Sequence, residues 1–416
     1  MSTRSGEDSG EPRGKSAMIK RVLGFGFMAC AGLGGFFIFA AARADAQTET
    51  ILHSFGSQPG DGANPHGGLL YSKGNLYGTT DFNAPSGNLG VVFEITAEGQ
   101  YTILYNFGGQ SGDGTAPCDF GGLAFRAGKL YGTTLYGGAT GGWGTVFDLT
   151  LKGREKVLHT FGGQPGDGAY PFAGVIFDKA GNLYGTTEEG GPYSSFCGGG
   201  CGTVYELTKA GEETVLYSFQ GLQDAAFPNA NLTFDKAGNL YGTTGTGGLY
   251  EHGTVFELSS TGVEKVLYSF NSQSGDGNVP YSGVVFGKKG DLYGTTFYGG
   301  AYGQGTVFEL SSTGEEKLLY SFGGQPSDGI NPYGSVIFDK KGDIYGTTFA
   351  GGLYGQGTVF EVSPTGEEKI LYTFGSQAGD GNTPIGGLVF DTAGNLYGVT
   401  ADGGAYGSGT VFEITP

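Results

Sequence analysis

The sequence is poor in the residues that most often carry catalysis or bind metals. Its 416 residues include four histidines, four cysteines and one tryptophan. Three signatures are absent after residue 46: the H-E-x-x-H of zinc proteases, the G-x-S-x-G of α/β-hydrolases and the G-x-x-x-x-G-K of phosphate-binding loops. The same part of the chain lacks the i, i+3, i+4, i+7 apolar spacing of a helix, and the 87 glycines of the chain oppose one. These absences exclude a helical fold and leave no familiar catalytic motif.

Positive charge is also scarce. The chain carries 22 basic and 40 acidic residues, and residues 1–46 hold six of the basic and four of the acidic ones. The remainder therefore has 16 basic and 36 acidic residues, a net charge of −20. Such a field repels phosphate backbones and anionic lipid headgroups. Nucleic acid is thereby excluded as a partner, and we interpret the acidity as an aid to solubility.

The N-terminal segment has the three parts of a secretory signal peptide. Lys20-Arg21 precedes an uncharged stretch at residues 22–42, and Ala44-Asp45-Ala46 supplies a small-residue cleavage site. We expect residues 1–46 to be removed before Gln47 and the protein to be secreted, to the periplasm or the extracellular space. The apolar stretch is long enough to cross a bilayer if it stays uncleaved, so a membrane anchor at residues 22–42 is the alternative.

Three cysteines, Cys118, Cys197 and Cys201, remain after cleavage. An exported chain meets oxidising conditions, so one disulfide is expected, with one thiol left over. Cys197 and Cys201 are the easiest to pair because the three glycines between them let the chain bend; Cys118 competes with this pairing. The spacing makes a weak case for zinc, since a further ligand would have to come from an unidentified histidine or aspartate. No metal site is predicted.

The rest of the chain is one tandem repeat. Tyr-Gly-Thr-Thr, once Tyr-Gly-Val-Thr, recurs seven times from Tyr77 to Tyr397 at intervals of 52 to 57 residues. Each unit contains four short runs rich in β-branched, apolar and aromatic residues, which predict strands. Most runs lack apolar–polar alternation, so both faces of each sheet are expected to be covered by neighbouring sheets. Four hairpin-connected strands per unit favour a propeller blade over a coil of a β-solenoid. In the sixth unit the predicted strands are 335–339, 343–348, 358–362 and 369–374.

The two ends of the repeat region predict a closed ring. Residues 49–55 match a fourth strand without the three that precede it, and residues 409–416 match a third strand with no fourth after it. Together they complete one blade, which gives an all-β propeller of seven four-stranded antiparallel blades over residues 47–416. Such a ring has no open sheet edge between its first and last blades. We expect a monomer. The predicted closing pair joins residues 50–55 to residues 409–414.

Loop lengths predict which face of the ring carries a site. Second-to-third-strand loops and blade-to-blade links are long and share one face, which we call the long-loop face, whereas the other turns are short. Flat aromatic rings on that face suit stacking on sugars. The candidate ligand-binding residues are Trp143, Tyr136, Tyr193, Tyr250, Tyr298, Tyr302, Tyr354 and Tyr406.

These tyrosines have an alternative role, because their regular spacing also suits pinning each loop onto the neighbouring blade. Trp143 is the stronger functional candidate, since its counterparts in other units are Gln304, Gln356 and Ser408. The third unit departs furthest from the repeat, with fifteen residues at 188–202 where regular units have nine. That insertion carries Cys197 and Cys201, so we expect a disulfide-braced protrusion, either a recognition loop or a tolerated insertion.

The polar residues of the repeat select no catalytic or metal site. Asp-Gly recurs in the links and would suit calcium, but one carboxylate per loop supplies too few ligands, and Asp-Gly is a common turn pair. His53 and His159 take a strand position that is tyrosine in other units, so we expect them to be packed. Nothing selects a carboxylate pair for glycosidic cleavage among the acidic residues of the long loops. Those residues are Asp119, Glu188, Glu189, Glu251 and Asp402.

The repeat unit resembles that of a known family. Gly238-Asn-Leu-Tyr-Gly-Thr-Thr244 and Gly253-Thr-Val-Phe-Glu-Leu258, with their equivalents over residues 50–416, are similar to the GloVer tandem repeat, named for Gloeobacter and Verrucomicrobia. The resemblance implies an exported bacterial repeat protein of uncharacterised function, often attached to the surface by a C-terminal anchor. This sequence stops at Pro416 with no sorting tail, so we expect free secretion or an N-terminal anchor instead. No catalytic residues come with the resemblance.

Two functions stay open at this point. One is a non-enzymatic binding or scaffold module, without a cofactor, whose long-loop face recognises a glycan or a protein. The other is a glycan-active lyase or hydrolase with a carboxylate site near the ring axis, and the fold accommodates both. Carboxylates and a histidine that converge on the axis would favour the enzyme, whereas a glycine-lined, uncharged axis would favour the binding module. The uniform repeats favour the binding module.

Overall fold

The computed structural model describes residues 47–83, 89–117, 121–139, 141–162, 164, 166–192, 194–271 and 273–415. The expected signal peptide at 1–46, with its alternative anchor at 22–42, lies outside the described residues, as do Cys118, Asp119 and Tyr193. Within the described residues, no helix is long and apolar enough to span a membrane.

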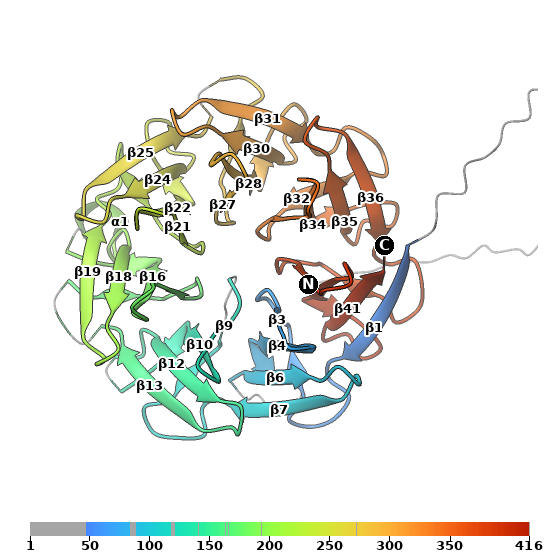
Figure 1. The fold of residues 1–416 in the computed structure, drawn as a ribbon, viewed down its shortest axis with the longest axis horizontal. Coiled ribbons are helices and arrows are strands. Elements are labelled where there is room, and N and C mark those ends of the chain that lie inside the picture. Colours follow the sequence, from blue (N-terminus) through green and yellow to red (C-terminus); the bar gives the residue numbers. More distant parts are fainter. Residues whose placement is uncertain are drawn as a thin grey trace, which may run out of the picture. The chain divides into compact units, whose positions relative to one another are not determined.

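Seven four-stranded antiparallel sheets surround a central axis, which confirms the predicted propeller (Figure 1). We number the blades from the N-terminus. The innermost strands of blades 1 to 7 are β3 (Leu70–Ser72), β9 (Ala124–Arg126), β15 (Ile176–Phe177), β21 (Thr233–Phe234), β27 (Val285–Phe286), β33 (Ile337–Phe338) and β38 (Val389–Phe390). The second strands are β4 (Asn75–Thr80), β10 (Lys129–Thr134), β16 (Leu183–Thr187), β22 (Leu240–Thr244), β28 (Leu292–Thr296), β34 (Ile344–Gly351) and β39 (Leu396–Thr400).

The two outer positions of each blade carry longer pairings. The third strands are β6 (Val91–Ile95), β12 (Thr145–Thr150), β18 (Thr203–Leu207), β24 (Thr254–Leu258), β30 (Thr306–Leu310), β35 (Thr358–Val362) and β41 (Thr410–Thr415). The outermost strands are β7 (Tyr101–Asn106), β13 (Glu155–Thr160), β19 (Glu213–Ser218), β25 (Glu264–Ser269), β31 (Glu316–Ser321), β36 (Glu368–Thr373) and, in blade 7, β1 (Thr48–Ser54). The outermost strands follow one another around the circumference (Figure 1).

The ring closes where the sequence predicts. β1 lies antiparallel to β41, with Thr48 opposite Thr415 and Ser54 opposite Thr410. The N-terminal strand therefore completes the blade that the last repeat leaves unfinished, in the sheet order β1-β41-β39-β38. Because every blade then has four strands, the first and last repeats present no unpaired edge to each other.

The Tyr-Gly-Thr-Thr motif has a separate structural reason at each of its last three positions. A Cβ atom added at Gly346 would lie 2.6 Å from the ring of Phe360 on the next strand, so only glycine leaves room for that ring. The hydroxyl of Thr347 donates to the carbonyl of Gly386 in the next blade, at 3.2 Å. Thr348 bonds within its own blade to Thr358, at 2.9 Å. The motif thus joins strand to strand and blade to blade.

The hydrophobic core lies between blades, at interfaces that we call seams. One cluster, for example, combines Val146 and Phe161 of blade 2 with Leu183 and Tyr205 of blade 3. An aromatic ring at the end of each outermost strand packs edge-on against a ring of the next blade's third strand, with centroids 5.0–5.3 Å apart, a favourable geometry for aromatic pairs. These pairs are Phe55–Phe93, Phe107–Phe147, Phe161–Tyr205, Phe219–Phe256, Phe270–Phe308, Phe322–Phe360 and Phe374–Phe412.

The links and the second-to-third loops pair with each other, which confirms that they share a face. In blade 2, for example, Thr115 of β8 lies opposite Tyr136 of β11. The link strands are β2 (Gly62–Ala63), β8 (Gly114–Thr115), β14 (Gly168–Ala169), β20 (Ala225–Ala226), β26 (Gly277–Asn278), β32 (Gly329–Pro332) and β37 (Gly381–Asn382). Their partners are β5 (Phe82–Asn83), β11 (Tyr136–Gly137), β17 (Glu189–Gly190), β23 (Thr246–Gly247), β29 (Tyr298–Gly299), the end of β34, and β40 (Asp402–Gly403).

Candidate functional site

Six of the tyrosines predicted to bind ligand are well exposed on the long-loop face. Their exposed fractions lie between 41% and 58%. Tyr302 also contacts the scaffold: a Cβ atom added at Gly324 would lie 2.8 Å from its ring, so that ring rests on the link leaving its blade. Tyr302 thus supports its own loop and still presents part of its ring to solvent. The six are Tyr136, Tyr250, Tyr298, Tyr302, Tyr354 and Tyr406.

Trp143 takes the position that the repeat predicts. It bridges Gly137 just as Gln304 bridges Gly299 and Gln356 bridges Gly351. The indole rests on Gly162, since a Cβ atom there would lie 2.2 Å from Trp143 Cδ1. It remains 39% exposed. The tryptophan therefore substitutes an aromatic surface for the flexible amide that other blades carry at this point.

Two of the candidates belong to one aromatic cluster, which we call the Trp143 cluster. Tyr170 joins them: its ring packs edge-on against Trp143 at 5.2 Å between centroids and against Tyr136 at 5.7 Å. Tyr170 was not among the ligand-binding residues predicted from the sequence. It follows β14 in the link that enters blade 3, and its backbone has φ = 58°, a conformation uncommon outside glycine and asparagine. The residue before the link proline has a positive φ in every blade and is asparagine, alanine, phenylalanine, valine or threonine in the others. A tyrosine at this variable position was the only signal that the sequence offered.

A second aromatic group was also missed by the sequence analysis. Tyr281 and Tyr333 stack at 4.9 Å between centroids, 14° from parallel, although they belong to the links of different blades. Phe297 packs edge-on against both rings, at 5.4 and 5.6 Å. Both tyrosines directly follow a proline of the link, which is the regularity that would have identified them.

Glycine backbone packs from blade to blade where the links enter the innermost strands. A Cβ atom added at Gly122 would lie 2.4 Å from the carbonyl oxygen of Gly68, and one at Gly174 would lie 2.4 Å from that of Gly122. Asn231 of blade 4 reaches across this region, donating to the carbonyl of Gly121 at 2.8 Å and accepting from the amide of Gly174 at 2.9 Å. This level of the ring is thus narrow, and the groups in contact there are uncharged.

Charged residues of the long-loop face lie in separate blades. His66 and Asp81 form a pair in blade 1, with 2.7 Å between Nδ1 and Oδ2. In blade 3, burial and the charge of Glu189 raise the pKa of Glu188 to about 7. Asp402 accepts a 3.4 Å hydrogen bond from Asn64 in an exposed position. These charged groups thus belong to three blades, 1, 3 and 7.

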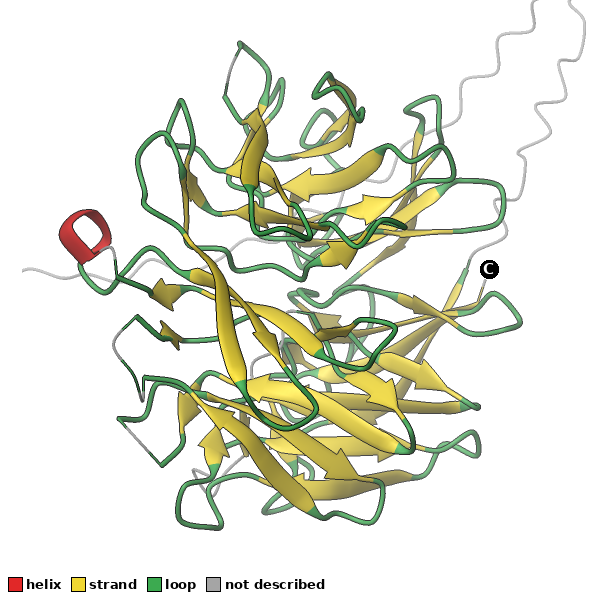
Figure 2. Ribbon diagram, turned by 60° about the vertical axis from the view of Figure 1, so that its left-hand side comes forward, coloured by secondary structure: helices red, strands yellow, loops and turns green. Residues whose placement is uncertain are grey.

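The insertion of blade 3 forms a short helix closed by a disulfide. Cys197 is bonded to Cys201, the pairing that the sequence favours. The helix α1 (Ser194–Cys197) lies at the outside of the ring (Figure 2). Phe196 is 53% exposed, yet its ring rests on Gly221 of the following link, where a Cβ atom would approach it to 2.3 Å. The insertion is therefore attached to the blade 3–4 seam, with an apolar ring at its surface.

The repeated link aspartates have a structural role. In five seams a tyrosine of the outermost strand donates to the aspartate of the link that follows: Tyr105–Asp113, Tyr217–Asp224, Tyr268–Asp276, Tyr320–Asp328 and Tyr372–Asp380, at 2.9–3.1 Å. Asp328 also accepts the backbone amides of Gly323 and Gly324. Because these bonds stabilise the turn of each link, they explain why the aspartate recurs.

A glutamate near the start of the next outermost strand faces each of these aspartates. Burial, and then the charge of the aspartate, raises the pKa of that glutamate to about 7. One buried oxygen of each glutamate has no hydrogen-bond partner. Five seams therefore hold a carboxyl pair that ionises fully only above neutral pH. The glutamates are Glu49, Glu155, Glu264, Glu316 and Glu368.

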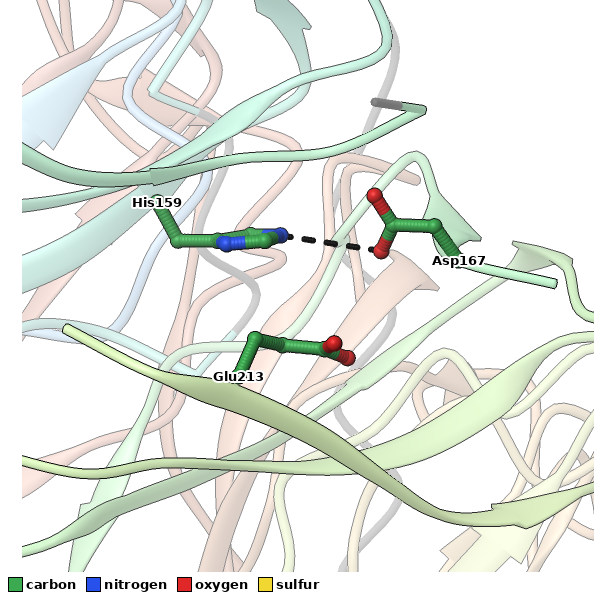
Figure 3. A group of neighbouring side chains, drawn as sticks. All are labelled: His159, Asp167 and Glu213. Atoms are coloured by element: carbon green, nitrogen blue, oxygen red, sulfur yellow. Dashed lines mark ion pairs between the residues drawn. The ribbon is translucent and has the colours of Figure 1, made fainter. Parts of the chain in front are cut away.

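Two seams replace the tyrosine with histidine. Between blades 7 and 1, His53 donates to the carboxylate of Asp61 at 3.2 Å and stacks on Tyr101, which stands where other seams have glutamate. Between blades 2 and 3, His159, Asp167 and Glu213 come together, with donor atoms all within 4.8 Å of one another (Figure 3). His159 is packed, as expected, with 17% of its side chain exposed. This grouping was not predicted from the sequence, although the histidine at a tyrosine position marked the seam.

Comparison with known proteins fits this architecture. The sequence profile of the Gloeobacter/Verrucomicrobia repeat matches residues 31–245, 90–286 and 234–416. The chain belongs to this repeat family. The resemblance read from the Tyr-Gly-Thr-Thr units is thereby confirmed. No curated protein sequence matches the chain.

Solved structures similar to this member of the Gloeobacter/Verrucomicrobia repeat family share its fold at low identity. One is described as the extracellular domain of a hybrid two-component system from B. thetaiotaomicron, at 14% identity and TM-score 0.53, covering 89% of this chain and 41% of that one. Another is described as a 6-phosphogluconolactonase from Bacteroides uniformis, at 15% identity and TM-score 0.48, covering 80% and 88%. At such identities the likeness extends to the fold alone.

Proposed function

We propose that this chain is an exported, non-enzymatic binding protein that recognises carbohydrate through its long-loop face. The Trp143 cluster carries the proposal. Trp143, Tyr136 and Tyr170 expose adjoining aromatic surface on rigid supports, and both Trp143 and Tyr136 keep more than a third of their surface in solvent. Tryptophan and tyrosine dominate binding sites because they bury a large area with few rotatable bonds.

Two further observations support a binding module over an enzyme. Near the axis, the contacts that join neighbouring blades are between uncharged glycine backbones, which favours a binding module. The His66–Asp81 pair and Glu188 belong to blades 1 and 3, which are not adjacent in the ring.

The disulfide of blade 3 supports export, since such bonds persist in oxidising compartments.

The test is a glycan array probed with protein expressed from the full 416-residue sequence, followed by titration of any sugar that binds. Trp143→Gln is the decisive variant, because glutamine occupies this position in blades 5 and 6 and is accommodated by the same scaffold. We expect this change to weaken binding about tenfold or more, the effect of losing one aromatic hot spot.

Leu353→Ala provides the matched control. Leu353 is a 68% exposed apolar residue in a second-to-third loop of the same face, remote in sequence from the Trp143 cluster. This variant should bind as the unmodified protein does. Silence across the array, or equal binding by the Trp143→Gln protein, would contradict the proposal. Binding to a protein partner with no sugar response would assign the face a different ligand.

A further inference from the structure

We propose that the seam between blades 2 and 3 binds a divalent transition-metal ion through His159, Asp167 and Glu213. Each residue comes from a different segment: His159 from β13, Asp167 from the link that follows, and Glu213 from the start of β19. Figure 3 shows the three side chains pointing toward one another. The proposal is independent of carbohydrate binding, which is placed on other side chains.

The donor set fits a metal better than it fits a hydrogen-bond network. His159 Nε2 lies 3.6 Å from Asp167 Oδ1, which is too long for a hydrogen bond. That nitrogen is buried without a hydrogen-bond partner, although buried polar atoms are almost always satisfied in native proteins. The Oε1 of Glu213 also lacks a partner, as do the equivalent glutamate oxygens of five other seams, so the histidine nitrogen is what sets this seam apart. A cation between the two atoms would satisfy both.

The other seams show how this arrangement departs from the repeat. Five seams place tyrosine where His159 stands, and its hydroxyl is satisfied by the link aspartate. The blade 7–1 seam has a histidine, but Tyr101 replaces the glutamate, and its ring stacks on His53 at 3.8 Å. Among the seven seams, only the blade 2–3 seam combines histidine with both carboxylates. The fold therefore tolerates tyrosine at this position and does not itself require the histidine.

The chemistry of the ligands selects the class of ion. One imidazole and two carboxylates suit zinc, manganese, iron and related ions, whereas calcium and magnesium prefer oxygen-only sets. Ligand atoms around a zinc ion lie about 3.4 Å apart when its bonds are about 2.1 Å. The observed separations lie within 4.8 Å, so side chains of the group would have to move inward when an ion binds. Three protein ligands would leave one position for water.

Asp167 is already oriented for this role. Its Oδ1 accepts the backbone amide of Gly168 at 2.8 Å, which fixes the carboxylate on the link. The side chain is almost wholly buried, with 2% of its surface exposed. On His159, an edge contact with Phe161 at 4.8 Å between centroids restrains the imidazole. Ligands held by such secondary contacts lose little freedom when a metal binds.

The experiment is isothermal titration of Zn²⁺ and, separately, Co²⁺ into untagged protein expressed from the full sequence, with the melting temperature recorded in parallel. We expect one ion per chain and a melting temperature that rises with zinc concentration. His159→Tyr restores the side chain of five other seams, so it should keep the metal-free melting temperature and lose affinity about tenfold or more. Glu213→Gln should weaken binding in the same direction.

Two controls separate this site from other donors. His53→Tyr makes the same substitution in the seam without the glutamate and should leave zinc affinity unchanged. Cys118→Ser removes the remaining thiol, a zinc ligand in its own right, and should also leave the affinity unchanged. Absence of zinc and cobalt binding, or equal affinity of the His159→Tyr protein, would overturn the proposal. Loss of zinc binding in Cys118→Ser alone would assign the metal to that thiol and overturn it equally.

Discussion

Glu49 accepts a 3.0 Å hydrogen bond from Gln377, which lies 328 residues further along the chain. The bond ties the first strand to the link that leaves blade 6, so the N-terminal strand contacts two blades at once. Together with the β1–β41 pairing, it makes ring closure depend on a short segment of the chain.

Deletion of residues 47–56 should open the ring. It removes the partner of β41 and exposes that strand as an unpaired edge, which favours self-association. The protein should melt at a clearly lower temperature and elute from a sizing column as dimers or larger species. Thr48→Ala is a suitable control, because this exposed residue at the start of β1 contributes little to packing. An unchanged melting temperature with a monomeric elution would contradict the closure.

Gly346→Ala should destabilise the protein by about 1–3 kcal/mol, the usual cost of overpacking a core. The added methyl group would meet the ring of Phe360 at 2.6 Å. Gly109→Ala is the matched control, because its new Cβ would have only one neighbour within 4 Å, at 3.7 Å, and the site is exposed. Chemical denaturation of the two variants measures the difference. Equal stabilities would show that the glycine of the motif has another role.

The stability of the propeller should fall as the pH rises from about 5 to about 8. Burial, together with the charge of Asp328, raises the pKa of Glu368 to about 7, and four other seam glutamates behave alike. A group whose pKa is raised on folding stabilises the fold below its unfolded value and loses that contribution as the pH passes its folded value. The melting temperature should therefore be higher at pH 5 than at pH 8.

Glu368→Gln isolates this effect from the overall negative charge. The amide resembles the protonated carboxyl, so the variant should melt above the unmodified protein at pH 8, and the gap should shrink toward pH 5. Glu367→Gln removes the same charge from an exposed neighbour. The difference between its melting temperature and that of the unmodified protein should not change with pH. If both variants responded to pH in the same way, the seam carboxyls would not be the cause.

The disulfide should act locally. Cys197 and Cys201 are only four residues apart, so the bond removes little chain entropy from the unfolded state. Cys197→Ser should leave the melting temperature nearly unchanged and raise amide hydrogen exchange in residues 194–200. The regular loop at 297–305 serves as the internal reference. Equal exchange in residues 194–200 with and without the bond would show that packing on Gly221 alone holds the insertion.

The fold could be predicted from the sequence because one unit repeats and its ends are complementary. The strand expected at 358–362 is β35, residue for residue, and the closing pair is β1 with β41. The innermost strand of the sixth unit, expected at 335–339, pairs only at Ile337–Phe338. Near the axis, neighbouring blades approach too closely for a longer ladder, and strand propensity does not report that crowding.

The candidate site could be predicted less completely, because it depends on contacts between blades. The sequence of a single repeat unit does not reveal those contacts. Exposure of the candidate tyrosines followed from their loops, but the position of Tyr170 beside Trp143 depends on the link of the next blade. Likewise, His159 and Glu213 lie 54 positions apart in the sequence and meet only because consecutive outermost strands run end to end. Such groups can be found when the residues that face each other in each seam are aligned, instead of the repeat units.

The glycine contacts around the axis constrain how many units fit into the ring. Each seam repeats one aromatic pair, phenylalanine against phenylalanine or, once, tyrosine, so these pairs on their own would accept an extra copy of the unit. Near the axis the backbone of Gly122 already lies against that of Gly68, with no room for a side chain. Gaining or losing a copy by recombination would alter that spacing all around the ring at once. The glycines near the axis therefore constrain the number of blades, whereas the aromatic pairs of the seams do not.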